Sequence, residues 1–209
     1  DAIGGSVLIE PISVKKDTLF GKTILNGASN GRGGSLSSGI TKGAKTGWAW
    51  NVLGTAKYLG DREAPNYVLS NTGIIEQNFS GNIRYSKSNY SVEGSYSVYN
   101  AQMGIARATH IGNTTDLYNA INNSEPNYIS GFSNAINSPK QEVTHHTAKL
   151  SYFQNVGLNN KFELHYAFQN NNRKEFDIRR SSTDKRAALD LGLISQNLGI
   201  HYKTFLKEW

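Results

Sequence analysis

Few residues of this chain have the types and spacing that metal binding requires. The only adjacent histidines are His145 and His146, and neighbouring side chains on a strand point to opposite faces, so the two rings cannot readily chelate one ion. His110 and His201 have no second ligand at a suitable spacing. Cysteine is absent, which excludes a thiol nucleophile, a disulfide and a cysteine metal site. We therefore predict no metal site.

The sequence also lacks the spacings of the common catalytic motifs. It contains no P-loop, no G-x-S-x-G, no H-E-x-x-H and no EF-hand loop. The glycine-rich run Gly31-Arg32-Gly33-Gly34 lacks the strand-to-helix context that a phosphate cradle needs. We predict a protein that is not an enzyme and that uses no cofactor.

Residue types suited to recognition lie in the segments between the expected strands. Tyrosine and arginine combine a large contact area with a polar tip, which suits them to ligand binding. The run Asp61-Arg62-Glu63 forms either a salt-bridged loop or a set of ligand contacts. We predict a ligand-binding surface that contains Arg62, Tyr67, Arg107, His110, Tyr118 and Tyr128.

The net charge of +6 suits a polyanionic partner, either nucleic acid or an anionic membrane surface. The densest basic stretch, residues 173–186, is interrupted by Glu175, Asp177 and Asp184, which favours a solvated loop. We therefore predict no nucleic-acid partner.

The elements that position these residues are expected to be strands. No run of about 18 apolar residues exists, so no transmembrane helix is predicted, whereas a membrane-spanning strand needs only about 10 residues with alternate positions apolar.

Alternation is clearest from residue 48 to 58, where one face carries Trp48, Trp50, Val52, Gly54, Ala56 and Tyr58. An apolar face with aromatic residues at both ends is typical of a strand that faces lipid. On the opposite face, Asn51, Thr55 and Lys57 would line a plug or a passage.

Similar alternation recurs along the chain. It is clear at residues 79–85, 90–98, 146–152 and 162–168, and weaker at 19–28, 34–42 and 188–202. The sequence thus predicts eight strands. A short helix is expected at 116–123, capped by Thr115.

The connections between these strands alternate in length after the first pair. Segments 43–47, 86–89 and 155–160 are short, whereas 59–73, 100–143 and 171–187 are long, and the two kinds fall at opposite ends of the sheet. Outer-membrane barrels have short periplasmic turns and long extracellular loops, while a soluble sandwich has no reason to separate them. We predict an all-β fold, an antiparallel transmembrane β-barrel segment of about eight strands that does not close.

The opening segment Asp1-Ala2-Ile3-Gly4-Gly5-Ser6-Val7-Leu8-Ile9-Glu10-Pro11 resembles the last plug strand of TonB-dependent outer-membrane receptors. Segments 58–67 and 172–177 also resemble loop sequences of that family. The resemblance implies that residues 1–13 end a plug domain and that residues 14–209 form the N-terminal part of a barrel of 22 strands. It also implies import that is powered by the TonB energy-transducing complex, through a segment outside this sequence.

On this reading the protein imports a scarce nutrient across the bacterial outer membrane, from the siderophore, cobalamin, glycan or peptide classes. Its expected partners are outer-membrane lipid, an extracellular small-molecule or oligomeric ligand, the TonB complex and a surface lipoprotein. Two alternatives stay open. One is a passive outer-membrane channel or surface adhesin, which would share the strands but lack the plug. The other is a secreted β-sandwich that binds carbohydrate.

Overall fold

The computed structural model describes residues 14–109, 111–157, 159–178 and 186–204. The segment 1–13, predicted to end a plug domain, lies outside the described residues. The predicted ligand residue His110 lies outside them as well.

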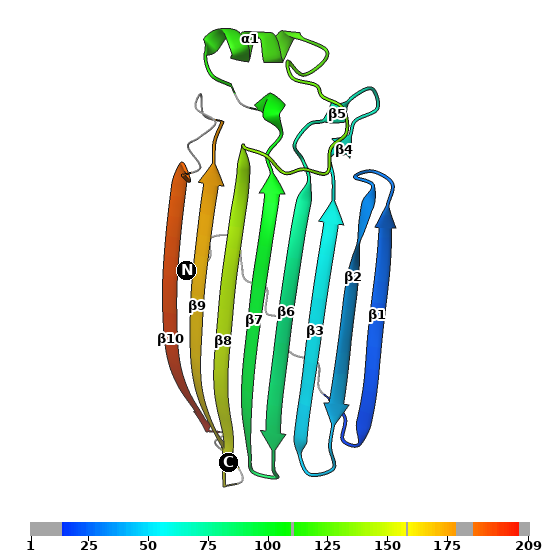
Figure 1. The fold of residues 1–209 in the computed structure, drawn as a ribbon. Helices are drawn as coiled ribbons and strands as arrows, with labels where there is room; N and C mark the ends of the chain where they lie inside the picture. Colours follow the sequence, from blue (N-terminus) through cyan, green and yellow to red (C-terminus); the bar gives the residue numbers. More distant parts are fainter. Residues whose placement is uncertain (1–13, 110, 158, 179–185, 205–209) are drawn as a thin grey trace, which may run out of the picture.

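Eight long antiparallel strands form one sheet, in which each strand pairs with the next long strand along the chain (Figure 1). The strands are β1 Thr18–Ala28, β2 Gly33–Gly43, β3 Trp48–Leu59, β6 Ile74–Ser86, β7 Tyr90–Gly104, β8 Lys140–Val156, β9 Asn160–Phe176 and β10 Leu189–Thr204. The prediction of an all-β fold with eight principal strands is confirmed. Several strands run further toward the long loops than the alternation indicated.

The long-loop end carries the remaining elements. Two short strands, β4 Arg62–Glu63 and β5 Val68–Leu69, pair with each other, and a 3-10 helix covers Arg107–Thr109. Helix α1 covers Thr114–Asn122. The expected start of this helix was wrong: Asn113, rather than Thr115, is its N-cap. Asn113 has extended backbone, and its Oδ1 accepts a hydrogen bond from the Asp116 N–H at 2.9 Å.

Turn length separates the two ends of the sheet as predicted. In Figure 1 the short turns after β2 and β6 lie at the bottom, where β8 also ends, and the long connections after β3 and β7 begin at the top, where β9 also ends. The sheet is not closed. Within the described residues, β1 and β10 each pair on one side only.

The described chain has almost no hydrophobic core. Leu59 and Ala101 are the only hydrophobic residues that the described residues bury. One sheet with no second layer cannot cover its own apolar side chains, because side chains on each face need a partner layer to pack against. More than 30 large hydrophobic residues are therefore exposed, among them Leu25 at 80% and Leu198 at 67%.

The strand register places most of the exposed hydrophobic residues of the sheet on one face. Val52 lies opposite Ile40 on β2 and Gly81 on β6, and this face continues to Tyr96, Leu150 and Ile200. We call it the apolar face. The other face, which carries Thr55 and its cross-strand neighbours, is called the polar face.

An aromatic row borders the apolar face near the short turns. Ring centroids are 4.8 Å apart for Trp48 and Tyr85, 6.2 Å for Tyr85 and Tyr90, and 6.3 Å for Tyr90 and Tyr152. Phe162 continues the row, 6.3 Å from Tyr152. Five rings from five strands thus lie side by side along one border of the apolar face.

The other border of the apolar face is polar. The Tyr96 hydroxyl lies 2.7 Å from Nδ1 of His146. Between Tyr96 and the long loops, the side chains on the same face are mostly polar. The residues there are Asn100, Gln102, Glu142, Thr144, Asn170, Asn172, Lys174 and Asp190. The apolar part of the face is therefore a band, bounded by rings at one end and by polar strand extensions at the other.

Candidate functional site

The long-loop end is held together by buried polar side chains. Asn71 donates from Nδ2 to the carbonyl oxygens of Asn137 and Pro139, at 3.0 and 2.7 Å, and to that of Ile105 at 2.9 Å. Its Oδ1 accepts from the Asn137 N–H at 2.8 Å. One asparagine therefore ties the segment after β3 to both ends of the segment between β7 and β8.

Asp61 makes a second tie between the same two segments. Its side chain is 1% exposed, and it accepts hydrogen bonds from the N–H groups of Thr72 at 2.9 Å and Ser133 at 3.1 Å. Backbone donors compensate the cost of burying this carboxylate. Ser70 adds a third contact, because its hydroxyl oxygen accepts from the Ser130 N–H at 2.9 Å.

The charged run Asp61-Arg62-Glu63 is engaged within the loops. Arg62 donates to the Asn30 carbonyl oxygen at 2.9 Å, and Glu63 forms a salt bridge with Arg32 at 2.6 Å. Within this run Glu63 forms a salt bridge, whereas Asp61 and Arg62 form hydrogen bonds with backbone groups. Through these contacts the first hairpin loop, residues 29–32, joins the other two segments. We call residues 29–32, 60–73, 105–109 and 111–139, which lie at the long-loop end of the sheet, the loop platform (Figure 1).

Two of the predicted ligand residues contact each other on the loop platform. Arg107 donates to the Tyr128 hydroxyl at 3.1 Å and places its guanidinium carbon 4.3 Å from the ring centroid. Tyr67 is half-buried beside the β4–β5 turn, and Tyr118 is 69% exposed on α1. Among the predicted residues that the structure describes, only Arg107 and Tyr128 are joined by a hydrogen bond or ring contact.

Helix α1 presents an apolar ridge that the sequence reading did not single out. Leu117, Tyr118 and Ile121 lie on one side of the helix, and the helix buries no residue. Ile121 is 71% exposed. These side chains enlarge the apolar part of the surface at the long-loop end.

The residues predicted to line a passage all lie on the polar face. The Thr55 hydroxyl lies 2.9 Å from that of Ser37, and Lys57 Nζ lies 3.8 Å from a carboxylate oxygen of Glu76. Asn51 shares this face by the strand register. Thr55 and Lys57 therefore contact side chains of the neighbouring strands β2 and β6.

A row of polar side chains crosses the same face closer to the loops. Asn78 pairs with Tyr99, Tyr99 with His145, and His145 with Asn171, on four adjacent strands. Sequence reasoning missed this row because only the register of β6 to β9 brings its members together. Strand alternation could have placed each residue on the polar face, but not side by side.

The two adjacent histidines lie on opposite faces, as predicted from strand geometry. His146 is on the apolar face beside Tyr96, with ring centroids 6.1 Å apart, and His145 is on the polar face. In the part of the chain that the structure describes, no group of three histidine, aspartate or glutamate residues could hold a metal ion.

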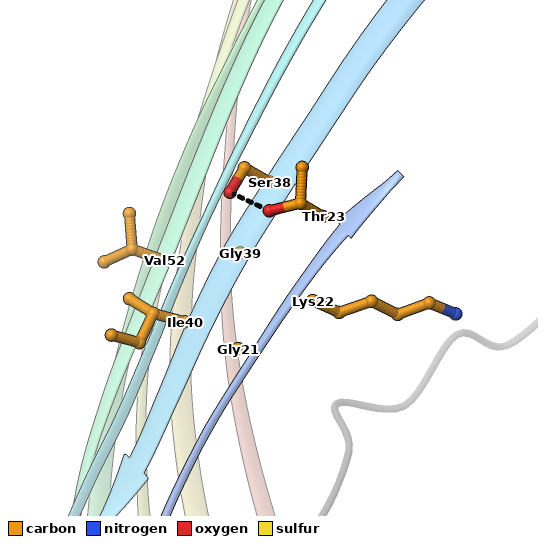
Figure 2. A pocket seen from close by; sticks show the side chains of 7 residues that line it. All are labelled: Gly21, Lys22, Thr23, Ser38, Gly39, Ile40 and Val52. Atoms are coloured by element: carbon orange, nitrogen blue, oxygen red, sulfur yellow. Dashed lines mark hydrogen bonds between the residues drawn. The ribbon is translucent and has the colours of Figure 1, made fainter. Parts of the chain in front are cut away.

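Two hollows mark the apolar face. One of about 360 Å³ lies across β1 to β3, where the Thr23 and Ser38 hydroxyls are 2.9 Å apart and Lys22 points away from Ile40 and Val52 (Figure 2). The other, of about 490 Å³, lies over Gly81 and Gly94. The first hollow thus offers apolar groups and one hydroxyl pair, but no charged group directed into it.

Comparison with known proteins adds no relative. No protein-family model, no curated protein and no solved structure matches the chain. A search of the described residues for a helix long and apolar enough to cross a membrane found none. Function is therefore inferred from the arrangement of the chain itself.

Proposed function

We propose that this chain forms part of the wall of a bacterial outer-membrane β-barrel, and that the barrel imports a scarce nutrient by the TonB-dependent mechanism. The observation that carries the proposal is the exposed apolar face, with its aromatic row at one border and polar strand extensions at the other. Membrane barrels have an outward apolar band that aromatic residues flank.

The energetics of the sheet support lipid as the solvent of the apolar face. Removing a leucine or isoleucine side chain from water is worth about 1.5–3 kcal/mol, and this sheet gains almost none of that stabilisation by packing on itself. In a bilayer the same side chains are solvated by hydrocarbon. Backbone groups of inner strands are satisfied by their neighbours, which is the condition that a membrane imposes.

The height of the apolar band also suits a membrane. From Trp48 to Tyr58, β3 advances about 33 Å at 3.3 Å per residue. A strand tilted by about 40°, as in membrane barrels, would then cover roughly 25 Å along the membrane normal, which matches their apolar band. Further strands would pair with the outer edges of β1 and β10, because an open edge is not stable in hydrocarbon.

Active import, rather than passive diffusion, is supported by two features. The opening residues 1–11 resemble the last plug strand of TonB-dependent receptors. The loop platform is fixed by the buried side chains of Asp61 and Asn71, which suits a surface that must bind a ligand before passage. Rearrangement of the plug would then control passage, and no covalent chemistry would be needed.

The test uses the protein in its own bacterium. We expect it in the outer-membrane fraction, with slower migration after heating in detergent, and we expect nutrient uptake to stop when TonB is deleted. Uptake that continues without TonB would instead favour a passive channel. A product that is soluble without detergent would contradict the barrel and favour the carbohydrate-binding sandwich.

A further inference from the structure

The net positive charge of the chain is concentrated at the end of the sheet that carries the short turns. We call this part the short-turn end and define it, among the described residues, as 14–18, 42–49, 85–91, 154–157, 159–162, 203 and 204. Asp17 is its only acidic residue. Its basic residues are all exposed lysines: Lys15, Lys16, Lys42, Lys45, Lys87, Lys161 and Lys203. The short-turn end therefore carries a large excess of positive charge.

The long-loop end has no such excess. In the loop platform and the strand ends that meet it, the described acidic and basic residues are nearly equal in number. Several of them are paired, such as Glu63 with Arg32 at 2.6 Å and Glu142 with Lys140 at 2.7 Å. The two ends of the sheet thus differ in charge, and the short-turn end is the one suited to an anionic partner.

The acidic residue of the short-turn end is already paired. Asp17 Oδ2 lies 3.0 Å from Lys45 Nζ, and both side chains are largely exposed. Lys42 and Lys87 form no salt bridge with any residue that the structure describes. Their exposed ammonium groups can therefore take an anion from outside the described chain.

These two lysines lie beside the aromatic row of the apolar face. Lys42 is on that face by the strand register, directly opposite Trp50. Lys87 is in the turn between Tyr85 and Tyr90, whose rings belong to the row and have centroids 6.2 Å apart. Aromatic rings at a membrane border lie at the level of the lipid headgroups, and a lysine extends its apolar stem to bring its charge to that level.

We propose that the short-turn end binds anionic phospholipids through their phosphate groups, with Lys42 and Lys87 as the contacts beside the aromatic row. An ammonium group offers three donors and a full charge to a phosphate oxygen. An acidic polymer in the aqueous compartment would meet the turns, but it would not meet Lys42 on the apolar face. This inference rests on the proposed function, since it requires that the apolar face meets lipid, and it names the lipid class that the wall retains.

The test measures the lipid preference of the full protein, purified from outer membranes and returned to phosphatidylcholine vesicles. A trace of spin-labelled phosphatidylglycerol or spin-labelled phosphatidylcholine reports how strongly each lipid associates with the protein. We expect phosphatidylglycerol to associate about twofold more strongly or better, because each lysine near the surface attracts an anionic headgroup. The double variant Lys42→Gln, Lys87→Gln should lose most of this preference.

Salt gives a second measurement that needs no variant. At about 1 M salt the Debye length falls to about 3 Å, so the preference of the unsubstituted protein should weaken strongly. A preference that salt does not change would contradict binding through the lysine charges.

The matched control is the double variant Lys22→Gln, Lys149→Gln. It also removes two positive charges, but from the middle of the polar face. It should leave the preference unchanged, and heat-modifiable migration checks the folding of both double variants. Equal losses from the two would overturn the proposal, as would equal association of the two lipids.

A different anionic partner would also be recognised. Binding of isolated peptidoglycan that the Lys42→Gln, Lys87→Gln variant loses, without any preference between the two lipids, would overturn the proposal in favour of an aqueous polymer. If the protein still enters vesicles and folds there, such a result leaves the barrel intact. A protein that stays soluble and does not enter vesicles would contradict the proposed function itself.

Discussion

At the scale of single residues, Asn71 has two roles: its backbone forms part of a turn, and its side chain connects two loop segments. Its φ of 65° lies in the left-handed region, which asparagine tolerates better than most residues. Its buried amide forms hydrogen bonds with the backbone at both ends of the segment between β7 and β8. Losing this side chain should therefore loosen the loop platform and leave the sheet intact.

We expect Asn71→Ala to destabilise the loop platform by about 2 kcal/mol, because several buried backbone groups lose their partner and alanine disfavours the positive φ. Amide hydrogen exchange of Asn137, which donates to Asn71 Oδ1, should quicken. Asn122→Ala on exposed α1 is the control and should change nothing there. Unchanged exchange at Asn137 would show that Asn71 does not hold the platform.

The sequence identified residue types at the candidate site but not their contacts. Arg62, a predicted ligand residue, donates a hydrogen bond to the Asn30 carbonyl, more than 30 positions away in the sequence. Only the pairing of β1, β2 and β3 brings the two together. No local pattern contains that information, and the same holds for the row that includes Asn78 and Tyr99.

At the scale of elements, neighbouring residues of β3 lie on opposite faces of the sheet. Val52 lies on the apolar face near the middle of the strand, and Leu53 is next to it on the polar face. Both are exposed in the sheet, at 37% and 47%, so exposure alone does not distinguish them. Their environments differ only if the apolar face meets lipid.

An arginine introduced on each face of β3 tests whether the two faces meet different solvents. Val52→Arg should destabilise the protein in bilayers by about 2–4 kcal/mol, because it puts an arginine at mid-membrane, and Leu53→Arg should cost much less. The measurement is the denaturant midpoint of unfolding from lipid vesicles. Equal costs for the two variants would mean that the faces of β3 are not solvated differently.

The alternation of apolar and polar residues predicted which segments form strands, but it did not predict where each strand begins and ends. Residues of β10 change phase along the strand, with Leu191 on the polar face and Leu198 on the apolar face. The register against β9 is unbroken, so the sequence changes phase while the backbone stays regular. The start of α1 was missed because Asn113 and Thr115 are both good capping residues, and only the backbone geometry distinguishes them.

At the scale of the whole molecule, the fold is one open layer of eight strands with loops gathered at one end (Figure 1). Strand number and loop segregation could be predicted, since both depend on local patterns. The near absence of a core is the feature that links sequence to function. On the proposed function, lipid would solvate the apolar face that the described residues leave exposed.

The most direct test of that claim is the accessibility of spin labels along β3 in lipid vesicles. The chain has no cysteine, so single cysteines at positions 52 to 57 can each carry a nitroxide. We predict that collisions with oxygen, which dissolves in lipid, dominate after Val52→Cys, Gly54→Cys and Ala56→Cys but not at the three positions between them. Equal access of a water-soluble nickel complex to all six positions would contradict a lipid-facing sheet.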